Sequence, residues 1–375
     1  MINPSSQLKV NEYQSFEGIR GVAALMVFFS HAVSMFYTGE LKFIFWDGAT
    51  AVNIFFILSG FFLSLNYVNE SNRPVRFSSY IIKRFFRLYP VYLAGMFFAI
   101  MVQYTVFQPG TMTGLSEWIN SKWTTSPTSS DILGYILVFG ASTDSINSTM
   151  WAMRVFIYVS LLFPLVIVPL KKMDSYFGLF ALFILSCVAH IAIPFLKFLP
   201  IFVIGGILAK YHKKLFSLME IKLKNKFFSV SLFLFALFLI NIRFYMPLFF
   251  NKSMPEHGLS VDPIMAVGWV IILYFSYKKI NSFQFLKNKY VCFLGKISYS
   301  FYIVHFPILL GITSVMYPLT NNIYLCISIS LIIVLLVAIL FYKFVEQPSH
   351  NLGRLLSKKI KSFPLRAMGT GSSSH

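Results

Sequence analysis

Membrane-length apolar segments follow one another along almost the whole chain. A transmembrane helix needs about 20 mostly apolar residues, and ten runs reach or approach that length. A weaker patch at 132–141 is too short and is expected to lie on the outer surface or dip into the bilayer. We predict an all-α integral membrane protein with about ten transmembrane helices. The runs cover residues 19–38, 50–68, 88–107, 148–170, 175–194, 195–209, 227–246, 263–277, 292–317 and 322–345, of which 195–209 and 263–277 are short.

Lysine and arginine residues gather on one side when these spans are threaded from a cytoplasmic N-terminus. The loops on the other side hold only Lys42, Lys122 and Lys252. The positive-inside rule explains this asymmetry and predicts that both termini are cytoplasmic. Most of the net charge of +19 then follows from topology, with some attraction to anionic lipid headgroups and no need for a nucleic-acid partner.

The composition agrees with a membrane protein, because 57% of the residues are hydrophobic and only 12% are charged, against about 25% in soluble domains. Cys187, Cys292 and Cys326 show neither paired spacing nor a metal-ligand pattern, so they are expected to be small core residues and no metal is expected. Residues 1–365 are predicted to form a single domain. Residues 366–375 resemble a linker with the start of an affinity tag.

Two longer polar segments, 108–147 and 247–262, fall on the predicted outer side. The second carries Glu256, His257 and Asp262. These segments are natural places for an external polar substrate to rest, or they are only connectors. The sequence leaves both readings open.

Arg20 and His31 lie in the first apolar run, eleven residues apart. Eleven residues make three helical turns plus about 20°, so both side chains share one face, about 16 Å apart along the axis. An ionisable side chain at this depth is costly, about 2.5–3.5 kcal/mol for arginine, and is a functional candidate by default. His31 is therefore predicted to be a base, or alternatively a polar residue hydrogen-bonded between helices.

Lys83, Arg84 and Arg87 stand at the cytoplasmic edge of the third run. Arginines three residues apart share a helix face, and guanidinium groups bind phosphate bidentately. The cluster suits a phosphorylated cytoplasmic ligand, and ordinary positive-inside anchoring is the alternative.

Further polar side chains occur in the fourth and ninth runs. Trp151 and Arg154 open the fourth run, where Arg154 either holds an anion in a cavity or snorkels to the surface. Ser298, Tyr302 and His305 are spaced to share one face of the ninth run. They are candidate substrate contacts, or a polar stripe satisfied between helices.

Five motifs in order along the chain resemble those of the acyltransferase family 3 membrane proteins. The opening arginine-x10-histidine motif matches Arg20 and His31, and the R-x-x-R motif matches Arg84 and Arg87. The resemblance runs from Phe16 to Pro348 and is carried by residues 16–24 with His31, 53–61, 84–90, 298–307 and 342–348.

This resemblance implies a multi-pass enzyme of the bacterial cytoplasmic membrane. It would transfer an acyl group, usually acetyl from acetyl-CoA, to a hydroxyl of a surface polysaccharide or lipid-linked glycan, as the stand-alone enzymes that O-acetylate lipopolysaccharide O-antigens do. It implies that His31 is catalytic, that Arg20 contributes to the site, and that Arg84 and Arg87 lie near the CoA phosphates. A glycan or small-anion transporter is the main alternative, although the chain shows no internal repeat.

One position departs from the family pattern. The fourth-helix motif usually reads W-x-x-x-x-E, and from Trp151 this chain places Phe156 where the glutamate belongs. A carboxylate there would orient or charge-stabilise the catalytic histidine. We therefore expect the chain to be inactive or much slowed, and Phe156→Glu to raise its activity.

Overall fold

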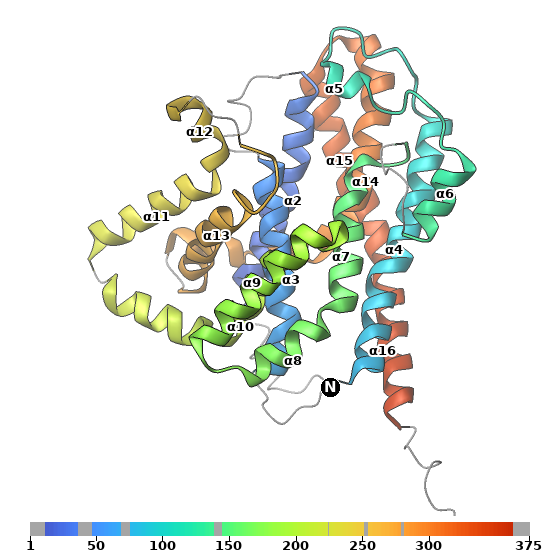
Figure 1. Ribbon diagram of the computed structural model, residues 1–375. Helices are drawn as coiled ribbons and strands as arrows, with labels where there is room; N and C mark the ends of the chain where they lie inside the picture. Colours follow the sequence, from blue (N-terminus) through green and yellow to red (C-terminus); the bar gives the residue numbers. More distant parts are fainter. Residues whose placement is uncertain are drawn as a thin grey trace, which may run out of the picture.

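The computed structural model of the chain describes residues 12–36, 47–68, 76–138, 145–223, 225–250, 254–278 and 281–362, and every regular element among them is helical (Figure 1). The predicted all-α class is therefore confirmed for this part of the chain. In chain order the elements are α2 (Gln14–Ser34), α3 (Gly48–Val68), α4 (Phe77–Thr105), α5 (Glu117–Asn120), α6 (Ser129–Ile136), η2 (Ser148–Met150), α7 (Trp151–Leu162), α8 (Pro164–Lys172), α9 (Tyr176–Ala192), η3 (Pro194–Leu196), α10 (Leu199–Lys222), α11 (Lys226–Ile240), α12 (Ile242–Phe250), α13 (Asp262–Tyr277), η4 (Asn281–Lys287), α14 (Lys289–Thr320), α15 (Ile323–Phe341), the π-helical η5 (Tyr342–Glu346) and α16 (Gln347–Ser362).

Each predicted apolar run overlaps helix among the described residues, with residues 37–38 of the first run outside them, but not every helix has the length of a span. Among the described residues, six helices are long and apolar enough to cross a membrane, or up to seven if the bent pair α7–α8 is one span. The remaining runs form the shorter apolar helices α9, α11 and α13. The count of ten spans and the cytoplasmic side of the termini stay predictions.

Several helix bounds differ from the apolar runs because a helix can continue through charged residues that end a hydrophobic run. The third run begins at residue 88, whereas α4 begins at Phe77 and includes the Lys83–Arg87 cluster. The run at 195–209 belongs to a candidate span from Pro194 to Ile221. The run at 227–246 breaks at Asn241, between α11 and α12. The patch at 132–141 contributes to the short helix α6.

Two pairs of long helices pack at close backbone distance, α2 against α14 and α3 against α10. A Cβ atom at Gly295 of α14 would lie 1.9 Å from the carbonyl oxygen of Glu17, and one at Gly205 of α10 would lie 2.0 Å from that of Ile57. Only glycine allows these approaches, as at close helix crossings in membranes. The α2–α14 contact matters most, because these two helices supply most of the polar residues described below.

The two ends of the bundle differ. Helices α2 and α4 end at the same end of the bundle as α5, whereas α4 begins and α16 ends at the opposite end (Figure 1). The Ser116 N–H donates to the Met35 carbonyl at 2.7 Å and ties α5 to the end of α2. We call these the α5 end and the α16 end.

A proline in the middle of α14 is compensated by a residue from another segment. Pro307 has no N–H, so the carbonyl of Ile303 loses its helical partner. The Asn147 side-chain amide, which comes just before η2, donates to that carbonyl at 3.2 Å. The backbone beside His305 is thus held in place although the helical ladder is interrupted.

Candidate functional site

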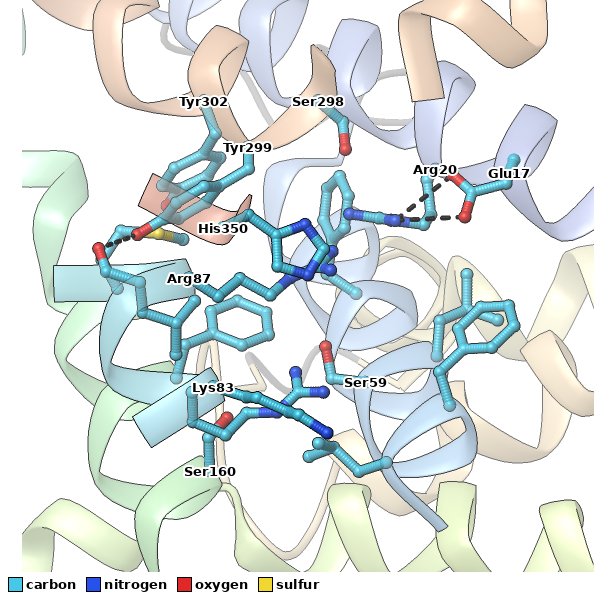
Figure 2. Close-up of a pocket in the computed structure, with 18 of the residues that line it drawn as sticks. Glu17, Arg20, Ser59, Lys83, Arg87, Ser160, Ser298, Tyr299, Tyr302 and His350 are labelled. Atoms are coloured by element: carbon cyan, nitrogen blue, oxygen red, sulfur yellow. Dashed lines mark hydrogen bonds and ion pairs between the residues drawn. The ribbon is translucent and has the colours of Figure 1, made fainter. Parts of the chain in front are cut away.

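The first of two cavities lies toward the α16 end and is lined by an unusual number of cations (Figure 2). Its volume is about 560 Å³. We call it the basic cavity, after its lining residues Arg20, Lys83, Arg84, Arg87, His350 and Arg354. Its size lies within the usual range for small-molecule sites. A concentration of positive charge around such a volume suits a ligand with several negative charges.

Three helices supply these cations. Arg20 comes from α2, the cluster at 83–87 from the first half of α4, and His350 with Arg354 from α16. His350 and Arg354 share a face of α16 because they are four residues apart. The preceding π-helical turn ends just before Pro348, which cannot donate to a carbonyl one turn earlier. Helix α16 then packs along α4, which brings both cationic pairs to the same cavity.

Among the described residues that line the basic cavity, cations outnumber acids. Arg20 pairs with Glu17 at 3.2 Å, and Glu17 is the acid among the lining residues (Figure 2). The Arg84 guanidinium lies over the Tyr80 ring, 5.8 Å from its centroid. The buried Ser298 hydroxyl also lines this cavity, with no hydrogen-bond partner among the described residues. The cavity therefore offers both charge and a free hydroxyl.

The second cavity, of about 390 Å³, lies toward the α5 end. We call it the histidine cavity, because His31 and His257 line it together with Trp118 and Trp151. Charged side chains complete its wall, namely Asp47, Lys122, Arg243 and Glu256. Indole rings and mixed polar groups are suited to a ligand with both apolar faces and hydroxyl groups.

His31 is held by a second histidine in a short hydrogen-bonded chain. The Nδ1 of His305 lies 2.6 Å from the Tyr302 carbonyl, which can only accept, so this nitrogen carries the proton. A neutral His305 then accepts at Nε2, and the Nδ1 of His31 donates to it at 3.0 Å. This assignment leaves the Nε2 lone pair of His31 available to act as a base or nucleophile.

Helix α5 places an indole ring against His31. The rings of Trp118 and His31 are stacked, with centroids 5.8 Å apart and planes 3° from parallel. The Lys122 ammonium lies 5.3 Å from the Trp118 centroid. The polar segment at the α5 end is thus more than a connector, since it shapes the wall beside the candidate catalytic residue.

The two cavities share part of a wall. Val52 of α3 and Tyr302 of α14 line both. The Tyr302 hydroxyl donates to the Thr149 carbonyl at 2.9 Å, which fixes the ring between the two spaces. A ligand in one cavity is therefore separated from the other by one layer of side chains.

The structure brings together most of the residues predicted from the sequence, but in two groups. Arg20, Lys83, Arg84, Arg87 and Ser298 line the basic cavity. His31 and Trp151 line the histidine cavity, and Tyr302 lines both. His305 is fully buried and lies behind His31.

Arg154 is not among the residues that line either cavity. Its Nε donates to the Tyr92 hydroxyl at 3.4 Å, and its guanidinium lies 5.5 Å from the Tyr135 centroid. The spacing of the sequence predicts only that it enters the membrane. Which face of α7 it occupies is decided by the packing of α4 and α6.

Phe156 lines the basic cavity, whereas His31 lines the histidine cavity. The Phe156 ring packs against Phe56 and Phe202, with centroids 4.7 Å and 5.7 Å away. The partner that orients His31 in the structure is His305. A glutamate at position 156 would accordingly meet the contents of the basic cavity first.

Sequence reasoning did not single out several lining residues. His350 and Arg354 follow the last apolar run, and Trp118 lies in a polar segment. The buried ion pair between Arg243 and Asp47 joins α12 to the start of α3 at 3.0 Å. Burial raises the pKa of the Asp47 carboxyl, and the Arg243 guanidinium opposes that rise. Apart from the periodic spacing of His350 and Arg354, no local signal marks these residues.

No group of three or more His, Cys, Asp or Glu side chains in the described part of the chain is placed to hold a metal ion. The two cavities offer imidazoles, guanidinium and ammonium groups, carboxylates and hydroxyls.

Comparison with known proteins identifies the family of the chain. Residues 13–343 match the family described as an acyltransferase domain, acyltransferase family 3. "Protein 2 in picA locus" of Rhizobium radiobacter is 33% identical over 102 residues, which cover 27% of this chain and 50% of that relative. The chain thus spans about half the length of this curated relative, and no solved structure matches it. Since the family match covers most of the chain, including helices α2 and α14, which both contribute to the cavities, the protein belongs to acyltransferase family 3.

Proposed function

We propose that the protein moves an acetyl group from cytoplasmic acetyl-CoA to a hydroxyl of a surface glycan outside the membrane, such as lipopolysaccharide O-antigen. The observation that carries the proposal is the pair of chemically different cavities with a common wall at Val52 and Tyr302. Such an arrangement lets a charged donor and a polar acceptor approach one reacting group without either crossing the bilayer.

The basic cavity is the donor site in this proposal. CoA carries several phosphate charges, and the cations at 83–87 with His350 and Arg354 offer charge-assisted hydrogen bonds to them. The positive-inside prediction puts this end of the bundle in the cytoplasm, where acetyl-CoA is found. Binding the phosphates here would point the acyl thioester toward the shared wall.

The histidine cavity is the acceptor site. A sugar ring presents an apolar face to the indoles of Trp118 and Trp151 and hydroxyls to the charged groups of the wall. His31 then acts either as the general base for direct attack on the thioester or as a transient acyl carrier. Both routes use its Nε2, which the His305 contact leaves free.

Phe156 removes a carboxylate that the family pattern places on the fourth span. In this chain an aromatic ring occupies that part of the basic cavity. We propose that it slows transfer, whether by loss of a charged partner or by displacement of the donor.

The test is transfer of labelled acetyl from acetyl-CoA to O-deacetylated surface polysaccharide. The purified protein is compared with His31→Ala and Phe156→Glu. We expect labelled O-acetyl ester from the present chain or from Phe156→Glu, and none above background from His31→Ala. Absence of transfer by every form would overturn the enzymatic proposal.

A transporter gives the opposite pattern in sealed vesicles. It would move a glycan or small anion across the bilayer without any new ester bond. The same vesicles, scored for ester formation and for flux, separate the two functions. Flux without ester would replace the proposal by the transporter.

A further inference from the structure

A second histidine of the histidine cavity is built like a general base. The Nδ1 of His257 lies 3.1 Å from an Asp262 carboxylate oxygen, and the other carboxylate oxygen accepts from the Gly258 N–H at 2.8 Å. The side chains of both partners are almost fully buried, with exposed fractions of 7% and 3%. A histidine oriented by a buried carboxylate is the arrangement that hydrolytic enzymes use to activate a hydroxyl.

The hydrogen bonds define the tautomer of His257. A carboxylate only accepts, so a hydrogen bond to Asp262 puts the proton on Nδ1 of His257 and, in a neutral ring, leaves a lone pair on Nε2. This Nε2 is buried and has no hydrogen-bond partner among the described residues. A buried imidazole nitrogen without a partner is unusual in folded proteins and calls for an explanation.

The surroundings of His257 restrict what that partner is. The ring is confined by Trp151 and Phe198, with centroids 5.2 Å and 4.9 Å away. It lines the same cavity as His31, which the proposed function assigns to the acceptor. In the Arg243–Asp47 ion pair of this wall the two charges are of opposite sign, while the buried Arg243 Nε has no hydrogen-bond partner among the described residues. A hydroxyl of the bound acceptor is the donor that fits the free nitrogen.

The two histidines of the cavity are anchored on different elements. His31 is held from α2 through His305 of α14, whereas His257 precedes α13 and is held by Asp262, the first residue of that helix. Asp262 is itself fixed, because its carbonyl accepts from the Asn53 amide of α3 at 3.0 Å. The cavity therefore carries two independently oriented imidazoles. His31 is held by His305, which in turn contacts Tyr302 of the shared wall. His257 lies in the polar segment before α13.

We propose that His257 is the general base for the acceptor hydroxyl and that Asp262 is its positioning residue, an inference that rests on the proposed function. The hydroxyl oxygen attacks the acyl carbonyl carbon while its proton passes to Nε2 of His257. A carbon–oxygen bond forms, and the bond from the acyl carbon to the thioester sulfur, or to His31 if that residue carries the acyl group, breaks. The leaving atom takes the electron pair, and His257 returns the proton to it. Of the two routes given for His31, this assignment favours the acyl carrier, because His257 takes the proton that the direct route would give to His31.

The decisive experiment compares two acceptors. O-deacetylated polysaccharide has hydroxyls that need a base, whereas hydroxylamine has an unprotonated amine at neutral pH and does not. His257→Asn keeps a donor near Nδ1 for Asp262 but has no nitrogen at the Nε2 position. We expect this variant to lose about 100-fold or more of the transfer to polysaccharide, the range of general-base catalysis. Formation of acetohydroxamate from hydroxylamine should stay within about 3-fold of the parent.

Asp262→Asn should show the same split with a smaller loss, since the ring remains but its tautomer is no longer fixed. In these assays the parent is whichever of two proteins, the unchanged chain or its Phe156→Glu variant, transfers acetyl faster. His190→Gln is the matched control, because His190 contacts the Lys197 carbonyl and is not among the residues that line either cavity.

The outcomes are distinct. Equal losses with both acceptors in His257→Asn, or full transfer to polysaccharide, overturn the role of His257. If His257→Asn does not fold, the ratio of the two transfers in Asp262→Asn decides in the same way. No transfer to either acceptor by the parent overturns the proposed function itself.

Discussion

The basic cavity and the histidine cavity share a wall but differ in the kinds of side chain that line them. Charge dominates the first, where six cationic or titratable basic side chains face one acid, Glu17. The second is organised around two oriented imidazoles, since His31 and His257 are each held through Nδ1 by a partner and charged side chains of both signs complete the wall. Several cations around one cavity can bind many phosphorylated ligands, whereas oriented imidazoles require a defined geometry. We therefore expect substitutions in the first to change affinity and substitutions in the second to change the rate.

The largest effect is expected at His31. His31→Ala should lower kcat for acetyl transfer by about 10³-fold or more, because either role, general base or nucleophile, requires the imidazole that this substitution removes. Its KM for acetyl-CoA should change little, since the proposed donor site is the other cavity. Steady-state kinetics measures both, with His190→Ala as control. A large rise in KM with an unchanged kcat would contradict the division between the cavities.

The second effect concerns stability. Arg243→Ala leaves the buried Asp47 carboxylate without its guanidinium partner and should destabilise the protein by about 3 kcal/mol. Burial already raises the Asp47 pKa, and the loss of Arg243 raises it further. A raised carboxyl pKa means that stability is present while the group is protonated and is lost as pH rises through the folded-state pKa. The melting temperature of the detergent-solubilised variant should thus lie further below that of the parent at pH 8 than at pH 5. Equal differences in melting temperature at the two pH values would show that Asp47 is not the group responsible.

The third effect tests charge in the basic cavity. Arg87→Ala should raise KM for acetyl-CoA by about 10–100-fold, since one charge-assisted hydrogen bond is worth about 1.5–3 kcal/mol. A thioester that lacks the 3′-phosphate should show a smaller difference between parent and variant if Arg87 contacts that phosphate. Lys214→Ala removes an exposed charge elsewhere and serves as control. Similar KM values for Lys214→Ala and Arg87→Ala would indicate that the basic residues at 83–87 only anchor the helix at the membrane surface and do not bind the donor.

The smallest effect is expected at Phe156, which lines the basic cavity. Phe156→Glu should raise acetyl transfer by about tenfold if the missing carboxylate supports the reaction. The glutamine of Phe156→Gln has nearly the same shape as glutamate but no charge. This variant therefore separates the effect of the charge from the effect of losing the aromatic ring. Both variants are measured by labelled ester formation. Equal turnover of Phe156, Phe156→Gln and Phe156→Glu would show that this position does not limit the enzyme.

Much of the basic cavity could be predicted from the sequence, because its signals are local. Arg84 and Arg87 share a helix face whatever surrounds them, and Arg20 and His31 share one because of their eleven-residue spacing. The helical class followed in the same way from the apolar runs. The bounds were less predictable: α4 begins eleven residues before its apolar run begins, because amphipathic turns continue the helix beyond the hydrophobic stretch.

The histidine cavity could be predicted only in part. His257 and Asp262 were visible as polar residues of one segment, but nothing in their spacing distinguishes an oriented pair from a connector. The His31–His305 contact joins residues 274 positions apart, and the Asn147 bond that supports the backbone beside His305 joins residues 156 apart. Such contacts depend on how α2, α14 and the segment before α7 pack, which no local pattern encodes.

The sequence by itself determined that this chain is a helical membrane protein with an arginine and a histidine on one face of its first helix and a basic cluster at the start of its third. These properties depend on hydrophobicity and on helical periodicity, and both act over a few residues. The tertiary structure decided that the candidate residues divide between two cavities, that position 156 faces the basic one, and that His31 is oriented by His305. The reason is that helix rotation and close glycine-mediated packing, rather than spacing along the chain, set which side chains meet.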